Sequence, residues 1–436
     1  MSDKLQAFDH WIRTEFAALN TDLEQCYFAQ EDKANVEGVG IQKKNQLRDE
    51  GHAFIQSILD EDFTDQPLDT AFDLLGNVGF YMAACRRHEV LELAESTQAF
   101  RDASTLAIQL SRIVGMTPRL ASAHITTHNK AVNGVCKRFT TLPDEMFFIQ
   151  QNTQSIFAYK RAADALLQLL PLGISHPITA DLLQTAQQAL EDVLKTNHAL
   201  FDGLDTETFF YSIRPYYKSY RVGVQVYRGI NAGDFAGVNV IDLLLGLCFA
   251  DEPFYAAILA DKIPYMVPEE QCILQHCMDT PNLMDAFLQA QQSKKEQWYQ
   301  TNLALFLAVC SLHGEITVQH HHRLVAKYVA NPAKRMARKH VAKVTASGLP
   351  LQKLMTQLEK LRDCRVGKQR DDIRTRYHDL NTLKASLNEP SSVDYGWRQH
   401  DELLRGAKTR YRIHSPRLVN REDAKHFVKE MVVEED

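Results

Sequence analysis

Three consecutive histidines give this chain its clearest capacity for metal chemistry. His320, His321 and His322 precede the sequence RLVAKYVANP. Neighbouring positions on a helix point about 100° apart, so three such imidazoles cannot chelate one ion from a regular helix. At most one faces inward, as the single axial ligand that haem iron requires of a protein. On spacing alone, an accidental polar run is the simpler interpretation.

A second histidine pair occurs in the sequence HITTH. His124 and His128 lie four residues apart and share one face if this segment is helical. A zinc protease needs a glutamate between two such histidines, whereas residues 125–127 are Ile, Thr and Thr. We therefore expect hydrogen-bonded structural histidines here rather than a metal site.

The span that follows the histidine run has an unusual charge distribution. Between Ile316 and Leu358 there is no Asp or Glu. The basic residues of this span are Arg323, Lys327, Lys334, Arg335, Arg338, Lys339, Lys343 and Lys353. A solvated basic helix face and an anion site both explain the pattern, and beside a histidine cluster the anion would be the propionates of a haem. Tyr328 is the sole aromatic residue of the span, so it lacks a stacking platform for nucleic acid.

The elements that must position these residues are helices. Apolar residues from Leu183 to Asn197 follow a three-four spacing, which places one stripe on a helix face. Leu303–Leu312 is apolar all round, as in a helix buried on every side, and Ser155–Leu170 forms another helix that Pro171 ends. Strand signals are few, so we predict an all-α fold.

Two breaks divide the chain. One is the polar stretch around Pro143, and the other begins near Asn388, beyond which the sequence is charged and weakly periodic. We predict a smaller N-terminal helical domain (1–143), a haem-binding helical domain (144–388) and a charged C-terminal extension (389–436).

The composition, net charge and cysteine content of the whole chain restrict the class of protein and the compartment that we expect. The 436 residues are 45% hydrophobic and 24% charged, which is typical of globular proteins, and the net charge of -6 gives no general attraction to nucleic acid. We expect no secretory signal and no membrane span. The eight cysteines are scattered without a CxxC pair, which favours reduced thiols in a cytoplasmic protein. Oligomeric state is not predicted.

The block from Phe209 to Leu247 carries a family resemblance. It contains an F-x-x-x-x-R segment, then Y-x-G, F-A-G and D-x-x-L-G, and it resembles the core of the indoleamine 2,3-dioxygenase-like haem proteins. HHHRLVAKYVANP is similar to the proximal-histidine helix of that family. RPYY and the His-rich helix make the chain most similar to the monodechloroaminopyrrolnitrin synthase (PrnB-like) sub-group. The resemblance covers roughly residues 70–390.

This resemblance implies an all-α protein that holds a b-type haem, uses O2 as co-substrate and oxidises an indole or tryptophan-type substrate. It implies His321 as the axial ligand, because its distance to Asn331-Pro332 matches the family helix. His322, which precedes Arg323, ranks second and His320 third. Arg323 and Lys327 are expected to contact the cofactor.

On the substrate side, the resemblance assigns three residues. Phe209 matches the aromatic residue over the substrate ring, and Arg214 matches the guanidinium that clamps a carboxylate. Ser155 lies beside the position of the family's distal serine helix. The structural alternatives are a core aromatic for Phe209 and an ion pair for Arg214, which precedes Pro215.

One departure from the family pattern bears on activity. In the dioxygenases a long Gly/Ser-rich loop follows F-A-G, whereas here Gly237 runs almost directly into residues 238–242. The shortened lid argues against ordinary tryptophan dioxygenation and leaves room for another aromatic substrate or outcome.

Two rival functions stay open: a haem-binding sensor or carrier without turnover, and a haem-free helical scaffold.

Overall fold

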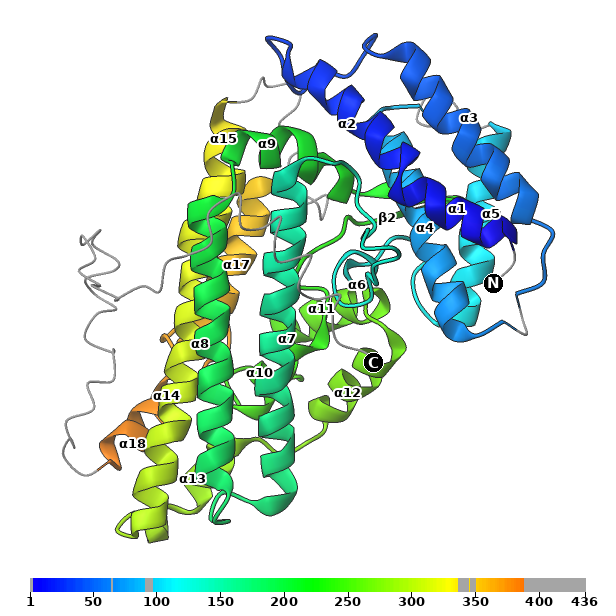
Figure 1. The fold of residues 1–436 in the computed structure, drawn as a ribbon. Coiled ribbons are helices and arrows are strands. Elements are labelled where there is room, and N and C mark those ends of the chain that lie inside the picture. Colours follow the sequence, from blue (N-terminus) through cyan, green and yellow to red (C-terminus); the bar gives the residue numbers. More distant parts are fainter. Residues whose placement is uncertain (1–2, 64–65, 91–96, 336–344, 346–349, 388–436) are drawn as a thin grey trace.

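The computed structural model describes residues 3–63, 66–90, 97–335, 345 and 350–387 (Figure 1). Helices make up most of these residues, which confirms the predicted all-α class. The described strands are β1 (Tyr220–Val222) and β2 (Gln225–Tyr227), which pair as an antiparallel hairpin. The predicted C-terminal extension, 389–436, lies outside the described residues, and the boundary at residue 143 remains a prediction.

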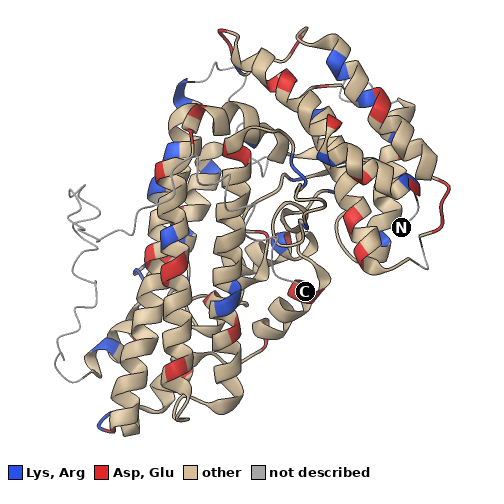
Figure 2. Ribbon diagram, viewed as in Figure 1, with Lys and Arg blue, Asp and Glu red and all other residues tan. Residues whose placement is uncertain are grey.

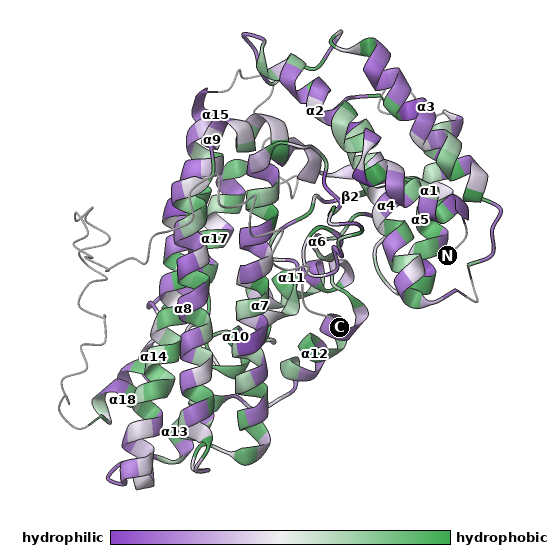
Figure 3. Ribbon diagram, in the orientation of Figure 1, coloured by the Kyte–Doolittle hydropathy of each residue, from purple (hydrophilic) through white to green (hydrophobic). Residues whose placement is uncertain are grey.

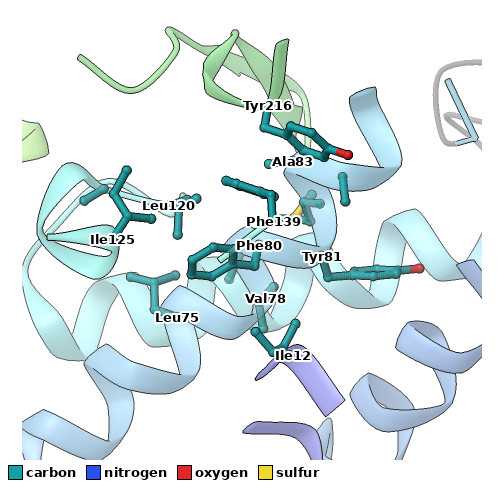
Figure 4. Packing of buried hydrophobic residues seen from close by; sticks show 14 of the residues in the cluster. Ile12, Leu75, Val78, Phe80, Tyr81, Ala83, Leu120, Ile125, Phe139 and Tyr216 are labelled. Carbon is teal, nitrogen blue, oxygen red and sulfur yellow. The ribbon is translucent and has the colours of Figure 1, made fainter. Parts of the chain in front are cut away.

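The N-terminal part of the chain forms one helical group, at the upper right of Figure 1. Its helices are α1 (Asp3–Arg13), α2 (Glu15–Phe28), α3 (Ile41–Ile58), α4 (Leu68–Arg87) and α5 (Gln98–Val114). Their apolar faces share a core with the short α6 (Ser122–Ile125) and with Phe139 and Tyr216 from later in the chain (Figure 4). This core therefore joins the N-terminal helices to the segment that contains Arg214.

Three long helices dominate the rest of the molecule and lie side by side in Figure 1. They are α7 (Pro143–Leu172), α8 (Thr179–Gly203) and α14 (Gln297–Gln319). The stripe predicted on α8 is buried throughout. Helix α7 runs one residue beyond Pro171, so the predicted end there was slightly early. The chain leaves α7 at Gly173, whose φ of 79° favours glycine.

The other helices that pack with these three are shorter. They are α10 (Ala236–Leu244), α11 (Pro253–Lys262), η4 (Ile263–Tyr265), α12 (Pro268–Met278), α13 (Leu283–Gln289), η5 (Gln291–Ser293), α17 (Leu351–Arg365) and α18 (Tyr377–Ala385). A second core forms where most of them pack on α7, α8 and α14. Near the N-terminal group, the chain after α8 forms α9 (Thr206–Thr208), η2 (Phe209–Ile213) and η3 (Arg214–Tyr217), and the chain after α14 forms η6 (His320–Ala330) and α15 (Asn331–Arg335).

One helix within the described residues passes the length and composition test for a membrane span. It runs from Gln297 to Arg335, and half of its most apolar window is buried. Helix α14 packs against α8, and Figure 3 shows polar and apolar residues mixed along the exposed sides of these helices. Burial in a protein core explains its composition, in agreement with the prediction for Leu303–Leu312, where no residue is exposed.

A glycine in α4 sets how closely the following segment approaches. A Cβ atom at Gly79 would lie 2.6 Å from the Leu120 backbone nitrogen and 2.8 Å from its Cα. We expect Gly79→Ala to lower the free energy of unfolding by about 1–3 kcal/mol, the usual effect of overpacking. Urea unfolding followed by far-UV circular dichroism would measure it.

Gly233→Ala is the matched control. Its Cβ would come no closer than 3.7 Å to Asn231 and Lys262, so the free energy of unfolding should change by less than about 0.5 kcal/mol. Equal effects of the two substitutions would show that the approach of Leu120 to α4 is not a tight constraint.

Candidate functional site

The three histidines open η6, a π-helix that continues α14. Such wider turns occur frequently at functional sites, because they change the direction in which side chains point. His321 is buried, with 7% of its surface exposed. The side chain of His322 lies outside the described part of the chain. Of the two histidines whose side chains are described, His321 is the buried one, and its role as a ligand remains a prediction.

His320 has a different environment. Burial, with smaller effects of Arg365 and His321, lowers the pKa of its imidazole to about 4. Its side chain nevertheless remains accessible to solvent. The preceding Gln319 is 8% exposed, and its side-chain oxygen has no hydrogen-bond partner in the described structure. The unpartnered Gln319 oxygen is the feature of this turn that fits contact with a bound group.

Phe209 lies against the histidine-bearing helix. Its ring contacts Tyr328 of η6 edge to face, with 5.6 Å between centroids, and Phe148 of α7 at 4.7 Å. Only 7% of Phe209 is exposed. The next residue, Phe210, packs with Ala333 of α15. The η2 segment therefore runs along η6 and α15, so the structure brings the predicted aromatic residue to the helix that carries His321.

Arg214 begins η3, directly after η2, and is also buried. Its guanidinium carbon lies 5.9 Å from the ring centroid of Phe210. Burial lowers the pKa of Arg214 to about 10, so the side chain keeps its charge at neutral pH. A buried, charged guanidinium is suited to bind a carboxylate through two parallel hydrogen bonds.

Ser155 occupies another place. Its hydroxyl lies 2.5 Å from the Thr196 hydroxyl, between α7 and α8. Thr196 in turn donates to the Val193 carbonyl. Among the described contacts, none joins Ser155 to Phe209, Arg214 or His321. Its catalytic role remains a prediction.

The basic residues of η6 face the end of α8. Lys327 donates to the Phe201 carbonyl, and its Nζ lies 4.4 Å from the centroid of the Phe201 ring. A guanidinium nitrogen of Arg323 lies 3.4 Å from His198 Nδ1. The last carbonyls of a helix lack partners within it and carry partial negative charge, which attracts cations. These contacts give both residues a structural role, and their role as cofactor contacts remains a prediction.

Further along the basic span, Lys334 and Arg335 are exposed on α15, where Figure 2 shows a basic end. Arg338, Lys339 and Lys343 lie outside the described residues.

The other predicted histidine pair is structural. His124 Nδ1 accepts from the Ala121 amide at 2.9 Å, and its Nε2 lies 3.0 Å from the Phe72 carbonyl. His128 Nδ1 lies 3.0 Å from the Thr127 hydroxyl. Burial lowers the pKa of His124 to about 3. The hydrogen-bonded histidines expected from the sequence are confirmed, and the described residues contain no cluster of three or more side chains able to hold a metal ion.

A buried ionic network below the histidine turn was not assigned from the sequence. The Asp242 carboxylate accepts from His313 Nε2 at 2.8 Å, from the Tyr255 hydroxyl at 2.8 Å and from two nitrogens of Arg365 at 2.7 Å. Asp242 is fully buried. Burial acts to raise its pKa, but Arg365 and His313 outweigh burial and hold the pKa of Asp242 below its usual range. One signal was present, since an aspartate within VNVIDLLLGL needs buried partners.

The F-A-G motif lies at a helix start. Phe235 is the N-terminal cap of α10, so Gly237 is already helical and no loop follows the motif. The Ala236 amide donates to the Glu270 carboxylate at 3.1 Å. A Cβ at Gly237 would lie 3.3 Å from Tyr159, so a small residue suits this contact. The structure thus agrees with the shortened lid expected from the sequence.

The helical fold and the placement of the Phe209–Arg214 segment along η6 agree with the resemblance to the indoleamine 2,3-dioxygenase-like haem proteins that the sequence motifs carry. More narrowly, the family model of monodechloroaminopyrrolnitrin synthase PrnB matches residues 2–387. The chain belongs to this family. The match also includes the N-terminal helices that precede the expected resemblance at about residue 70.

The Asp242 network generates a stability prediction. Asp242→Ala leaves Arg365 buried without its carboxylate, so the free energy of unfolding should fall by about 3–5 kcal/mol. The control Asp192→Ala removes a carboxylate that pairs with Arg161 and Lys195 at the surface, and should cost less than about 1 kcal/mol. Urea unfolding of both variants would test this, and a small loss for Asp242→Ala would contradict it.

Proposed function

We propose that this protein is a haem-dependent oxygenase that acts on a tryptophan-type aromatic substrate, with O2 as co-substrate and a b-type haem held by His321. The observation that carries the proposal is the contact between Phe209 and Tyr328, which sets the η2–η3 segment along the histidine-bearing helix. Family membership supports an oxygenase, and the eight free thiols fit a cytoplasmic setting.

The residues of η6 fit a haem. The group takes one imidazole from the protein, and His321 offers one from a buried position on η6. His321 also has the spacing of the family ligand. His322 is the second candidate, and His320, whose side chain is exposed, is the third. When bound, the haem supplies the redox chemistry towards O2.

The protein's own residues then bind and orient the substrate. The Arg214 guanidinium holds the substrate carboxylate, and the Phe209 ring packs against the aromatic ring. Phe148, Phe209 and Tyr328 form a contiguous aromatic wall that excludes water. Exclusion of water strengthens the ionic contact of Arg214, because the local dielectric constant falls.

The first test concerns the axial ligand. His321→Ala should abolish stoichiometric haem binding, because η6 then offers no imidazole at the ligand position. Haem reconstitution followed by the Soret absorption measures this, and His320→Ala should retain the band. Added imidazole should restore the band in His321→Ala if the loss is one of ligation rather than folding.

A different pattern of spectra among the histidine variants would assign the axial ligand to another histidine or would exclude haem binding. Loss of the band in His320→Ala or His322→Ala, with a normal spectrum for His321→Ala, would place the ligand one position away. A wild-type protein that takes up no haem would support a haem-free helical scaffold.

The second test concerns substrate recognition. Arg214→Leu should weaken tryptophan binding by about 2–5 kcal/mol, since a carboxylate would be left buried and unpaired. Tryptamine lacks the carboxylate, so its binding should change far less. Titrations of the Soret shift with both ligands provide the measurement.

Arg221→Leu is the control, because Arg221 is exposed on the β1–β2 hairpin. Equal losses for tryptophan and tryptamine in Arg214→Leu would mean that Arg214 holds the fold. A wild-type protein whose haem spectrum responds to no indole would support a haem carrier or sensor instead.

A further inference from the structure

The segment that contains Phe209 and Arg214 is held by a buried ion pair of the N-terminal helices. Arg87 of α4 donates to the Glu24 carboxylate of α2 from Nε at 2.7 Å and from Nη2 at 2.8 Å. The same Nη2 donates to the Tyr211 carbonyl at 3.0 Å. Glu24 and Arg87 are 1% and 7% exposed, so solvent does not compete for these bonds.

The Tyr211 carbonyl needs this donor for a reason found in the sequence. In a regular helix it would accept from the amide four residues later, but that residue is Pro215, which has no N–H. Here the chain passes instead from the π-helix η2 into the 3-10 helix η3, with the Arg214 amide bonded to the Phe209 carbonyl. The guanidinium of Arg87 thus supplies the hydrogen bond that proline removes.

A second anchor lies just after Arg214. The Tyr216 ring stacks on Phe139 with 4.5 Å between centroids, at the edge of the N-terminal core (Figure 4). Its hydroxyl lies 3.3 Å from His88 Nε2 and also contacts Glu24. His88 is fixed in turn by Tyr27 at 2.9 Å and Asn20 at 2.7 Å. Arg214 therefore lies between two residues that are both tied to α2 and α4.

We propose that Glu24 and Arg87 are positioning residues for substrate recognition: they hold Tyr211 and Tyr216 so that the Arg214 guanidinium is set at the carboxylate of the substrate. The identity of that carboxylate rests on the proposed function. The claim that Glu24 and Arg87 hold residues 209–217 in place does not depend on the proposed function.

The effect of the Glu24–Arg87 pair on residues 209–217 can be measured separately from its effect on the stability of the fold. Replacing both partners of a buried ion pair leaves no unpaired charge, and such replacements are often neutral for stability. In Glu24→Gln/Arg87→Met, glutamine keeps polar atoms near Ser212 and Tyr216, which bond to Glu24. Methionine retains volume but offers no donor to Tyr211. The double variant should therefore fold and bind haem while residues 209–217 lose an anchor.

The experiment compares this double variant with wild type in the haem-loaded protein. Amide hydrogen exchange in peptides covering 209–217 should accelerate by about tenfold or more, the factor equivalent to one lost hydrogen bond to a charged group. The Soret band should stay as in wild type, and urea unfolding should remain a single cooperative transition. Tryptophan affinity should fall by about tenfold or more, and tryptamine affinity should change by less than about twofold.

A surface pair provides the control. Asp192→Asn/Arg161→Met removes an exposed ion pair between α8 and α7, 2.7 Å apart, and should leave exchange and both affinities unchanged. Unchanged exchange in 209–217 of the Glu24→Gln/Arg87→Met variant would overturn the inference, as would equal loss of tryptophan and tryptamine binding. If wild type responds to neither ligand, the proposed function fails, and the exchange measurement alone decides whether the pair holds this segment.

Discussion

The carboxylate of Asp242 is the acceptor around which the larger helical group is arranged. It lies on α10 and receives hydrogen bonds from Tyr255 on α11, His313 on α14 and Arg365 on α17. A buried carboxylate without such partners is costly, so these four helices have to meet at this point. His313 lies two turns before His320 and His321 on the same continuous helix, and fixing α14 here therefore fixes the direction of the histidines.

The rotation of the histidine helix is set at its other end. The Tyr328 hydroxyl donates to the Leu200 carbonyl at 2.6 Å, and Lys327 donates to the Phe201 carbonyl. Both carbonyls belong to the last turn of α8, where the helix carries partial negative charge, and the Leu200 carbonyl also accepts from the Leu204 amide at 3.2 Å. Because Tyr328 must point at the end of α8, its ring edge is presented to Phe209, and the opposite end of the same helix carries His321.

The sequence patterns predicted those features of the structure that depend on residues close together along the chain. Three-four spacing identified α8 and the buried part of α14, and motif resemblance identified the segments around Phe209 and His321. The partners of Asp242 could not be predicted, because they lie 13, 71 and 123 residues away and any buried cation or hydroxyl would satisfy the same need. The absence of acidic residues likewise predicted an anion as the partner of Arg323 and Lys327. Instead, Lys327 bonds to a carbonyl at the end of α8 and Arg323 lies against His198, and neither partner contributes a formal negative charge to the sequence.

Two buried ion pairs thus lie on the two sides of the candidate site: Glu24–Arg87 next to the segment with Arg214, and Asp242–Arg365 below the histidine turn. Such pairs add little net stability, but their bidentate geometry is satisfied in one arrangement. The segment proposed to bind the substrate and the helix proposed to bind the cofactor are therefore held by separate ion pairs, and they meet where Phe209 contacts Tyr328. Since α10 begins directly after Phe235, no loop follows the F-A-G motif that could close over a substrate. Exclusion of water must then come from aromatic packing that is already formed, which requires both pairs to hold their segments in place before a substrate binds.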